Sequence, residues 1–192
     1  TAGDFNGDGF ADAVFTSQDA AGGLARSYVF NGSTSGPGAS GQAADADAIF
    51  EGSNTSDSLL SFIVGENTGD AFDDLAIVQT DGSFPVSLLI VPGSADGPGS
   101  GVTKASDAAA LCYESEFAGD GLGGTNILDY NGDGRLDLGI SAFFYPSGTG
   151  QGRIYFYYDQ AGSGIARESL AEADFTLSGD STGECFGSFS AR

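Results

Sequence analysis

The chain of 192 residues contains no histidine and no tryptophan, and only six of its residues are lysine or arginine. Histidine is the commonest general base and the commonest metal ligand among side chains, so its absence removes the usual catalytic and transition-metal chemistry. The six cations face 27 aspartates and glutamates, which gives a formal net charge of -21. Because a nucleic-acid-binding surface needs a basic footprint, this balance excludes nucleic acid as a partner and disfavours an anionic membrane surface.

Long apolar runs are missing as well. No run of 18 apolar residues occurs, so we expect no membrane insertion. No signal peptide opens the chain, so a secreted protein would be present here in its mature or excised form. The two cysteines, Cys112 and Cys185, permit one disulfide, and the sequence leaves their pairing open.

Glycine and the aromatic residues are abundant. The chain has 32 glycines, 15 phenylalanines and 7 tyrosines, and 40% of its residues are hydrophobic. Disordered chains lack aromatic residues to bury, so this composition indicates a folded protein. Many short strands joined by glycine-rich turns fit it best, and we predict one all-β repeat domain over residues 1–192.

The chain is organised around an acidic loop at residues 4–12, Asp-Phe-Asn-Gly-Asp-Gly-Phe-Ala-Asp. Oxygen-bearing side chains fall at its positions 1, 3, 5 and 9, and a glycine stands where the backbone must turn. This pattern suits Ca²⁺, which takes six to eight oxygen ligands at roughly 2.3–2.6 Å. An EF-hand would need a glutamate at position 12, where this chain has Phe15, so the loop leads into a strand. The predicted ligands are Asp4, Asn6, Asp8, the carbonyl of Phe10 and Asp12.

The acidic loop recurs at residues 129–137 and, in degenerate form, at residues 66–74. The starts at residues 4, 66 and 129 give spacings of 62 and 63 residues, and a fixed period of this size indicates a repeat architecture. Asp, Asn and Gly also favour ordinary turns, but turns do not require oxygens at all four positions twice over. We therefore predict two calcium sites and leave the occupancy of the middle one open, because Ala71 replaces its glycine. The further predicted ligands are Asp129, Asn131, Asp133, the carbonyl of Arg135 and Asp137, and in the middle loop Glu66, Thr68, Asp70 and Asp74.

Four β-prone segments follow one another in each period, which predicts one four-stranded antiparallel blade per repeat. The repeats run approximately over residues 1–63, 64–126 and 127–192. Each is expected to end with the strand that enters the next acidic loop. Only residues 105–111 resemble a helix, and their counterparts in the other repeats favour strand. One blade cannot cover both of its faces, so neighbouring blades must stack.

The chain resembles the FG-GAP family, the calcium-binding blade repeat of integrin α-subunit β-propellers and many bacterial surface proteins. The resemblance is carried by residues 4–12 and 129–137, by Tyr-Val-Phe-Asn-Gly-Ser at 28–33 and by Phe-Gly-Ser at 186–188. It implies β-propeller blades with Ca²⁺ between the last strand of one repeat and the first of the next. Three blades rarely close a ring, so the chain belongs to a larger ring or to an assembly of several chains, including a head-to-tail polymer.

The resemblance implies an extracellular or cell-surface calcium-binding protein with a structural or adhesive role, through a protein partner or self-association. The alternative is a carbohydrate-binding propeller lectin in which Tyr145, Tyr155 or Tyr157 stacks on a glycan. Sheet packing is the favoured explanation of these aromatics, and the absence of tryptophan weakens the lectin hypothesis. Two N-glycosylation patterns, at Asn31 and Asn54, leave open whether the protein is a glycoprotein.

We do not expect an enzyme. Acidic pairs such as Glu114 with Glu116 or Asp73 with Asp74 are expected by chance among 27 acids. No serine or cysteine stands beside a base, so nucleophilic catalysis has no support. The glycine-rich residues 121–124 and 148–152 do not open a helix after a strand, so neither predicts a phosphate-binding loop.

Overall fold

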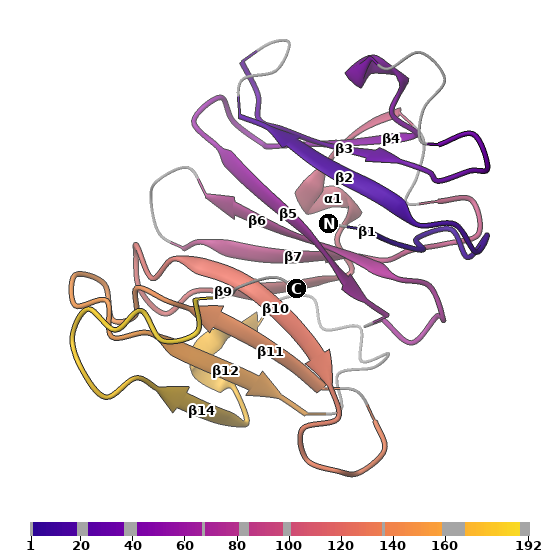
Figure 1. Cartoon of the computed structure of the whole chain (residues 1–192). Coiled ribbons are helices and arrows are strands. Elements are labelled where there is room, and N and C mark those ends of the chain that lie inside the picture. The colour runs from indigo at the N-terminus through magenta and orange to yellow at the C-terminus, as the bar shows by residue number, and fades with distance from the viewer. Residues whose placement is uncertain are drawn as a thin grey trace.

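The computed structural model describes residues 2–18, 23–36, 42–66, 68–80, 85–97, 101–135, 137–158 and 168–188. The described residues form an all-β structure with three short helical turns, which confirms the all-β part of the prediction (Figure 1). The elements are β1 (Ala2–Gly3), β2 (Asp12–Ser17), β3 (Arg26–Phe30), η1 (Ala43–Asp45), β4 (Ala48–Glu51), β5 (Ser58–Gly65), β6 (Asp74–Thr80), β7 (Ser87–Val91), β8 (Gly101–Lys104), α1 (Ala105–Ala108), β9 (Leu111–Glu114), β10 (Leu122–Leu128), β11 (Asp137–Ala142), β12 (Arg153–Tyr157), β13 (Glu168–Ser169), η2 (Leu170–Glu172) and β14 (Phe175–Ser178).

The strands form three sheets that lie one beside the next (Figure 1). Sheet A has the order β1-β2-β3-β4-β8, sheet B the order β13-β9-β7-β6-β5, and sheet C the order β10-β11-β12-β14. Each contains four antiparallel strands in chain order, as predicted for a blade. Each begins with the strand before an acidic loop, because the loop joins antiparallel neighbours. The sequence analysis had grouped that strand with the preceding segments.

Two of the sheets carry a fifth strand, which corrects the prediction of purely four-stranded antiparallel blades. Strand β8 pairs in parallel with β4 of sheet A, and β13 pairs in parallel with β9 of sheet B. In each case a segment of the following repeat crosses to the outer edge of the preceding sheet. It then enters a helical turn, α1 or η2, before its own sheet continues.

These helical turns correct a second prediction. The counterparts of residues 105–108 were expected to favour strand, yet η1 and η2 are 3-10 turns at the same place in their repeats. All three segments are rich in alanine, the residue with the strongest intrinsic preference for helix. The residues at both ends of each turn have extended backbone conformations, which limits the helix to one turn.

Two apolar layers separate the three sheets. The layer between A and B includes Val29, Phe50 and Ile77. The layer between B and C includes Ile90 and Ile140. All five side chains are buried. Strand β6 of the middle sheet B buries residues on both faces, because sheets A and C lie on its two sides.

The two cysteines lie in different environments. Cys112 is buried in the layer between sheets A and B, and Cys185 lies in a partly exposed turn near Gly150. The structure contains no disulfide bond between them. Within the described ranges, no helix is long and apolar enough to cross a membrane.

Candidate functional site: the acidic loops

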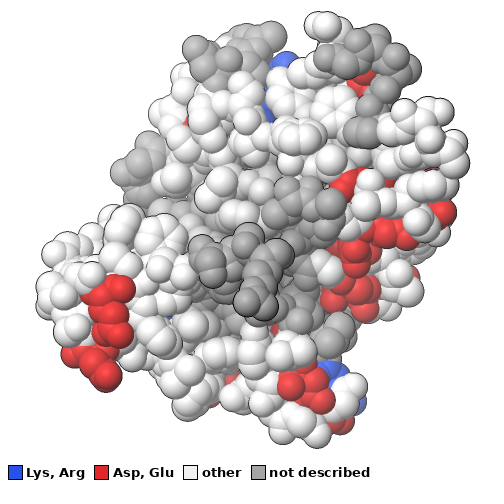
Figure 2. Space-filling view, viewed as in Figure 1, with Lys and Arg blue, Asp and Glu red and all other residues white. Residues whose placement is uncertain are grey.

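The three acidic loops occupy equivalent places in the three sheets. Residues 4–11 connect β1 to β2, residues 66–73 connect β5 to β6, and residues 129–136 connect β10 to β11. All three leave the sheets on the same side of the molecule, at the right and lower right of Figure 1. Acidic atoms gather over that side in the space-filling view (Figure 2).

The first loop is held by hydrogen bonds between its own side chains and backbone. The Asp4 carboxylate accepts from the amides of Asp8 and Gly9, both at 3.0 Å. Asn6 Oδ1 accepts from the Asp8 amide at 3.1 Å, and Asp8 Oδ1 accepts from the Phe10 amide at 2.8 Å. Gly9 has a φ of 86°, the left-handed conformation that glycine adopts without strain. The side chains at positions 1, 3 and 5 are therefore turned into the loop.

The third loop repeats this geometry bond for bond. Asp129 accepts from the amides of Asp133 and Gly134 at 3.1 and 2.9 Å. Asn131 Oδ1 accepts from the Asp133 amide at 2.9 Å, and Asp133 Oδ1 accepts from the Arg135 amide at 2.9 Å. Two segments 125 residues apart thus form the same oxygen-rich loop because they share the same residues at positions 1, 3, 5 and 6.

The middle loop keeps part of this geometry at a cost. Asp70 Oδ1 accepts from the Phe72 amide at 3.0 Å, as the acid at position 5 does in the other loops. Ala71 has a φ of 75°, so an alanine adopts the left-handed conformation that glycine takes in the other two loops. Thr68 donates to Asp74 Oδ1 at 3.3 Å, and Glu66 accepts from the Gly69 amide. The backbone turn survives while the side-chain contacts differ.

The ninth residue of each loop is a buried carboxylate that binds the backbone. Asp12 accepts from the amides of Phe5 at 2.8 Å and Gly32 at 2.6 Å. Burial raises the pKa of Asp12, nearby Asp8 raises it further, and the amide donors oppose the shift. At the equivalent position, Asp74 accepts from the Gly93 amide at 3.0 Å. Asp137 accepts from the backbone amides of Tyr130 at 2.8 Å and Asn131 at 3.2 Å. The residues concerned, Asp12, Asp74 and Asp137, are all 0% exposed.

Two glycines that the sequence analysis did not assign complete this arrangement. The backbone amides of Gly32 and Gly93 donate to Asp12 and Asp74. Each is the second residue of one of two similar segments, Asn-Gly-Ser-Thr-Ser-Gly-Pro-Gly at 31–38 and Pro-Gly-Ser-Ala-Asp-Gly-Pro-Gly at 92–99. A Cβ added at Gly32 would lie 2.4 Å from the Ala11 carbonyl oxygen. A Cβ added at Gly93 would lie 2.4 Å from the Asp73 carbonyl oxygen. Only glycine permits the backbone to approach these carbonyl oxygens so closely. The similarity of the two segments was the sequence signal for these glycines.

The first two loops are in direct contact. The Asp4 amide donates to Asp73 Oδ2 at 2.8 Å, and the Asp73 amide donates to the Asp4 carbonyl at 3.2 Å. The Ser94 amide donates to the Phe5 carbonyl at 3.0 Å. Sheets A and B are therefore joined at their loop ends as well as through their core.

The side-chain oxygens of each complete loop are of the types that a hard cation binds. Positions 1, 3 and 5 supply two carboxylates and one amide oxygen, the donors that Ca²⁺ prefers. A carboxylate has about four lone-pair sites, so the amide bonds leave acceptor capacity. Within the part of the chain that the structure describes, no three acidic or cysteine side chains converge as a metal cluster. Further ligands would have to come from backbone carbonyls such as those of Phe10 and Arg135, or from water.

A second set of acids accepts from the backbone in equivalent turns, and Asp57 and Asp120 stand before the first strands of sheets B and C. Asp57 accepts from the amides of Ser53 at 2.6 Å and Asn54 at 2.9 Å. Asp120 accepts from Phe117 at 2.9 Å, and Glu184 accepts from two amides of its own turn at 2.7 and 3.1 Å. The spacings of these three acids follow the repeat period. That period was the sequence signal by which they could have been identified, although the sequence did not lead us to predict them. They stabilise turns.

The aromatic residues proposed for glycan stacking are engaged in packing. Tyr155 is 0% exposed and Tyr157 is 2% exposed, both in the layer between sheets B and C. The Arg153 guanidinium lies over the Tyr145 ring at 3.8 Å and contacts Glu116 at 3.3 Å. Burial raises the pKa of the Tyr155 hydroxyl. None of the three rings presents an open platform.

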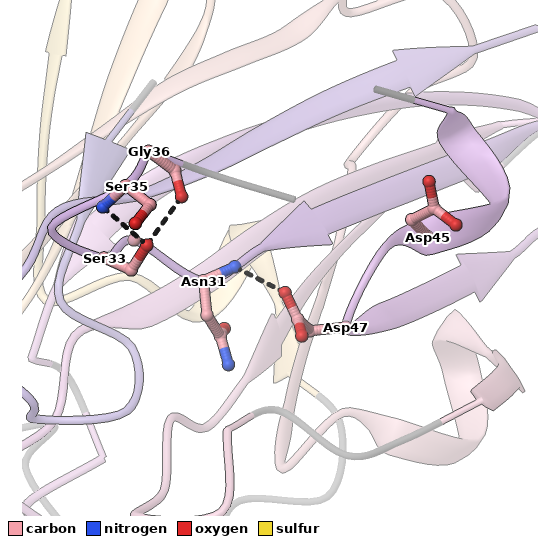
Figure 3. Close-up of a pocket in the computed structure, with 7 residues that line it drawn as sticks. Asn31, Ser33, Ser35, Gly36, Asp45 and Asp47 are labelled. Carbon is pink, nitrogen blue, oxygen red and sulfur yellow. Dashed lines mark hydrogen bonds between the residues drawn. The ribbon is translucent and has the colours of Figure 1, made fainter. Parts of the chain in front are cut away.

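A polar hollow of about 430 Å³ lies on sheet A beside the turn after β3 (Figure 3). The Asn31 amide donates to Asp47 Oδ2 at 2.7 Å across its floor. Asn31 Oδ1 is buried, and the side chain lies near Gly97, whereas Asn54 is exposed. Of the two glycosylation patterns, the one at Asn54 is therefore the more accessible. The lining residues are Asn31, Gly32, Ser33, Ser35, Gly36, Asp45 and Asp47.

Comparison with protein-family models finds no match to this chain, and comparison with the curated proteins finds no match either.

Proposed function

We propose that the protein is an extracellular calcium-binding structural or adhesion protein of the FG-GAP propeller type. In this proposal Ca²⁺ is bound by residues 4–12 and 129–137, and it rigidifies the turns that join the first two strands of sheets A and C. The observation that carries the proposal is the set of hydrogen bonds that these two loops share, with oxygen side chains at positions 1, 3 and 5 turned inward in both.

The proposed ion would act on stability and on contacts rather than on chemistry. A ligand that binds only the folded chain stabilises it by mass action, by about 2.7 kcal/mol at one hundred times its dissociation constant. Loops of this kind bind weakly enough to suit the millimolar calcium outside cells, roughly 10⁻⁴–10⁻³ M. The formal charge of -21 also favours association with a divalent cation.

The test compares thermal unfolding in calcium and in EDTA for the wild-type chain and for Asp8→Asn and Asp133→Asn. Asparagine keeps the Oδ1 acceptor that caps the Phe10 or Arg135 amide, so the metal-free loop should hold, while calcium loses a carboxylate. We expect calcium at one hundred times its dissociation constant to raise the melting temperature of the wild-type chain by roughly 5–10 °C for each occupied site, from about 2–4 °C per kcal/mol at this chain length. Each variant should lose part of that rise.

The matched control is Asp45→Asn, which removes one exposed acid outside the loops. It should leave the calcium-dependent rise unchanged. An equal rise in all four proteins would mean that calcium acts through general charge screening, and no rise in the wild-type chain would remove calcium from the proposal. No contact in the described structure favours the carbohydrate-binding alternative, because Tyr155 and Tyr157 are buried.

A further inference from the structure

Sheet B shows how one repeat packs on the next. Alternate residues of β6 point to opposite sides, so Leu75 and Ile77 lie in the layer against sheet A, and Ala76 and Val78 lie in the layer against sheet C. Strands β2, β6 and β11 each begin at the buried aspartate of an acidic loop. Counting from that aspartate identifies the equivalent positions of the three sheets.

One face of sheet A is exposed where its equivalents are buried. Phe15, Ile77 and Ile140 are equivalent and pair with Tyr28, Leu89 and Tyr155 on the adjacent strands. Ile77 and Ile140 are 0% exposed because they pack on the preceding sheet, whereas Phe15 is 61% exposed. We name this surface face A, and it comprises Ala13, Phe15, Tyr28, Phe30, Ile49 and Val102.

The opposite end of the stack shows the complementary feature. Leu111 and Tyr113 of sheet B are 3% and 1% exposed, because sheet C covers them. Their equivalents in sheet C, Phe175 and Leu177, pair with β12 in the same way and are 47% and 42% exposed. We name this surface face C, and it comprises Tyr130, Ile154, Phe156, Phe175 and Leu177.

Part of face C is covered by the chain near Gly187. A Cβ on Gly187 would lie 3.0 Å from Ile154 and 3.2 Å from Ser141, so residues near Gly187 run across part of this face. The Tyr130 and Phe175 rings flank Phe156, with centroids at 4.8 and 5.9 Å from it. The outer edge of β14 has no paired strand within the described ranges, whereas β4 and β9 are extended by β8 and β13.

We propose that face A of one copy of this chain packs on face C of a second copy, in the manner in which sheet B packs on sheets A and C. The occupant is a second copy because each open face matches one side of an interface that this chain already forms twice. The two faces differ, so the contact is heterologous and produces a closed ring or an open polymer. The inference goes beyond the proposed function and is independent of calcium.

The experiment measures particle mass by light scattering over a wide range of chain concentration, in calcium and separately in EDTA. Salt at about 0.15 M screens the repulsion between acidic surfaces. The wild-type chain should form multiples of its own mass, and Phe15→Lys and Phe175→Lys should each weaken association at least about tenfold, which corresponds to about 1.4 kcal/mol. Phe117→Lys, which changes a side chain of similar exposure, 49%, on neither face, is the matched control and should associate as the wild type does.

Mixing the two variants tests the polarity of the contact. A chain with Phe15→Lys retains face C, and a chain with Phe175→Lys retains face A, so an equimolar mixture should form a heterodimer that neither forms alone. Leu177→Lys is a second variant of face C, should Phe175→Lys impair folding by uncovering Phe156. A single-chain mass for the wild type at every concentration overturns the inference, as do variants that associate like the wild type or a mixture that stays monomeric. Association that persists in EDTA while calcium has no effect on melting would remove the calcium proposal and keep this one.

Discussion

The middle acidic loop contains a strained alanine whose removal should stabilise the protein. Ala71 has a φ of 75°, at the position where Gly9 has 86° and Gly134 has 90°. A non-glycine residue in the left-handed region costs about 1–2 kcal/mol, because its Cβ approaches the following carbonyl oxygen. Ala71 is exposed, so Ala71→Gly loses little buried surface.

The net gain is smaller than the strain. Glycine makes the unfolded chain more flexible, which offsets about 0.4–1 kcal/mol. Ala71→Gly should therefore stabilise the folded chain by about 0.5–1 kcal/mol. For a domain of this size that corresponds to a rise in melting temperature of roughly 1–4 °C.

The matched control is the reverse change at the equivalent position, Gly134→Ala. No atom lies within 4 Å of a Cβ built there, so the change introduces backbone strain and no clash. It should destabilise the chain by a similar amount. Urea unfolding followed by circular dichroism in EDTA measures both effects without a contribution from bound cation. A destabilising Ala71→Gly beside a destabilising Gly134→Ala would show that the middle loop does not share the backbone turn, and the reasoning would be refuted.

Three further predictions concern the buried polar contacts. Folding raises the pKa of Asp120 above its ordinary value of 3.8, chiefly by burial, so its contribution to stability is present below that pH and is lost as the pH rises through the raised pKa. Asp120→Asn should therefore raise the melting temperature at pH 7, and this rise should become smaller in acid. A rise in melting temperature that does not depend on pH would contradict the prediction. Gly93→Ala should lower the free energy of unfolding by about 1–3 kcal/mol, because its Cβ would lie 2.4 Å from the Asp73 carbonyl oxygen. An unchanged free energy in urea unfolding would mean that the first two loops are not held together at this point. Asp57→Ala should cost about 1–3 kcal/mol, because it leaves the amides of its own turn without their acceptor. Thermal melts compare it with Asp96→Ala, which removes an exposed acid, and equal melting temperatures for the two variants would contradict this prediction.

The sequence determined the local features of this protein. The spacing of acidic loops predicted three equivalent units, and the alternation of apolar residues predicted most of the strands, because both depend on residues close together in the chain. The positions of Asp4, Asn6 and Asp8 predicted an inward-turned oxygen loop, and the two complete copies share these hydrogen bonds because they have the same residues at positions 1, 3, 5 and 6. Left-handed backbone at Gly9 and Gly134 followed from the same motif.

Only the tertiary structure decided how distant residues meet. The burial of Asp12 against the Gly32 amide depends on the turn after β3, which lies 20 residues further along the chain. The parallel addition of β8 to β4 joins two repeats, and no periodicity within one repeat predicts it. Phe15 and Ile77 have the same place in the motif, yet one is 61% exposed and the other is buried, because burial depends on whether a neighbouring sheet is present. Local sequence patterns determine the strands and turns of each repeat, whereas the free energy of burial depends on which surfaces of the repeats come into contact.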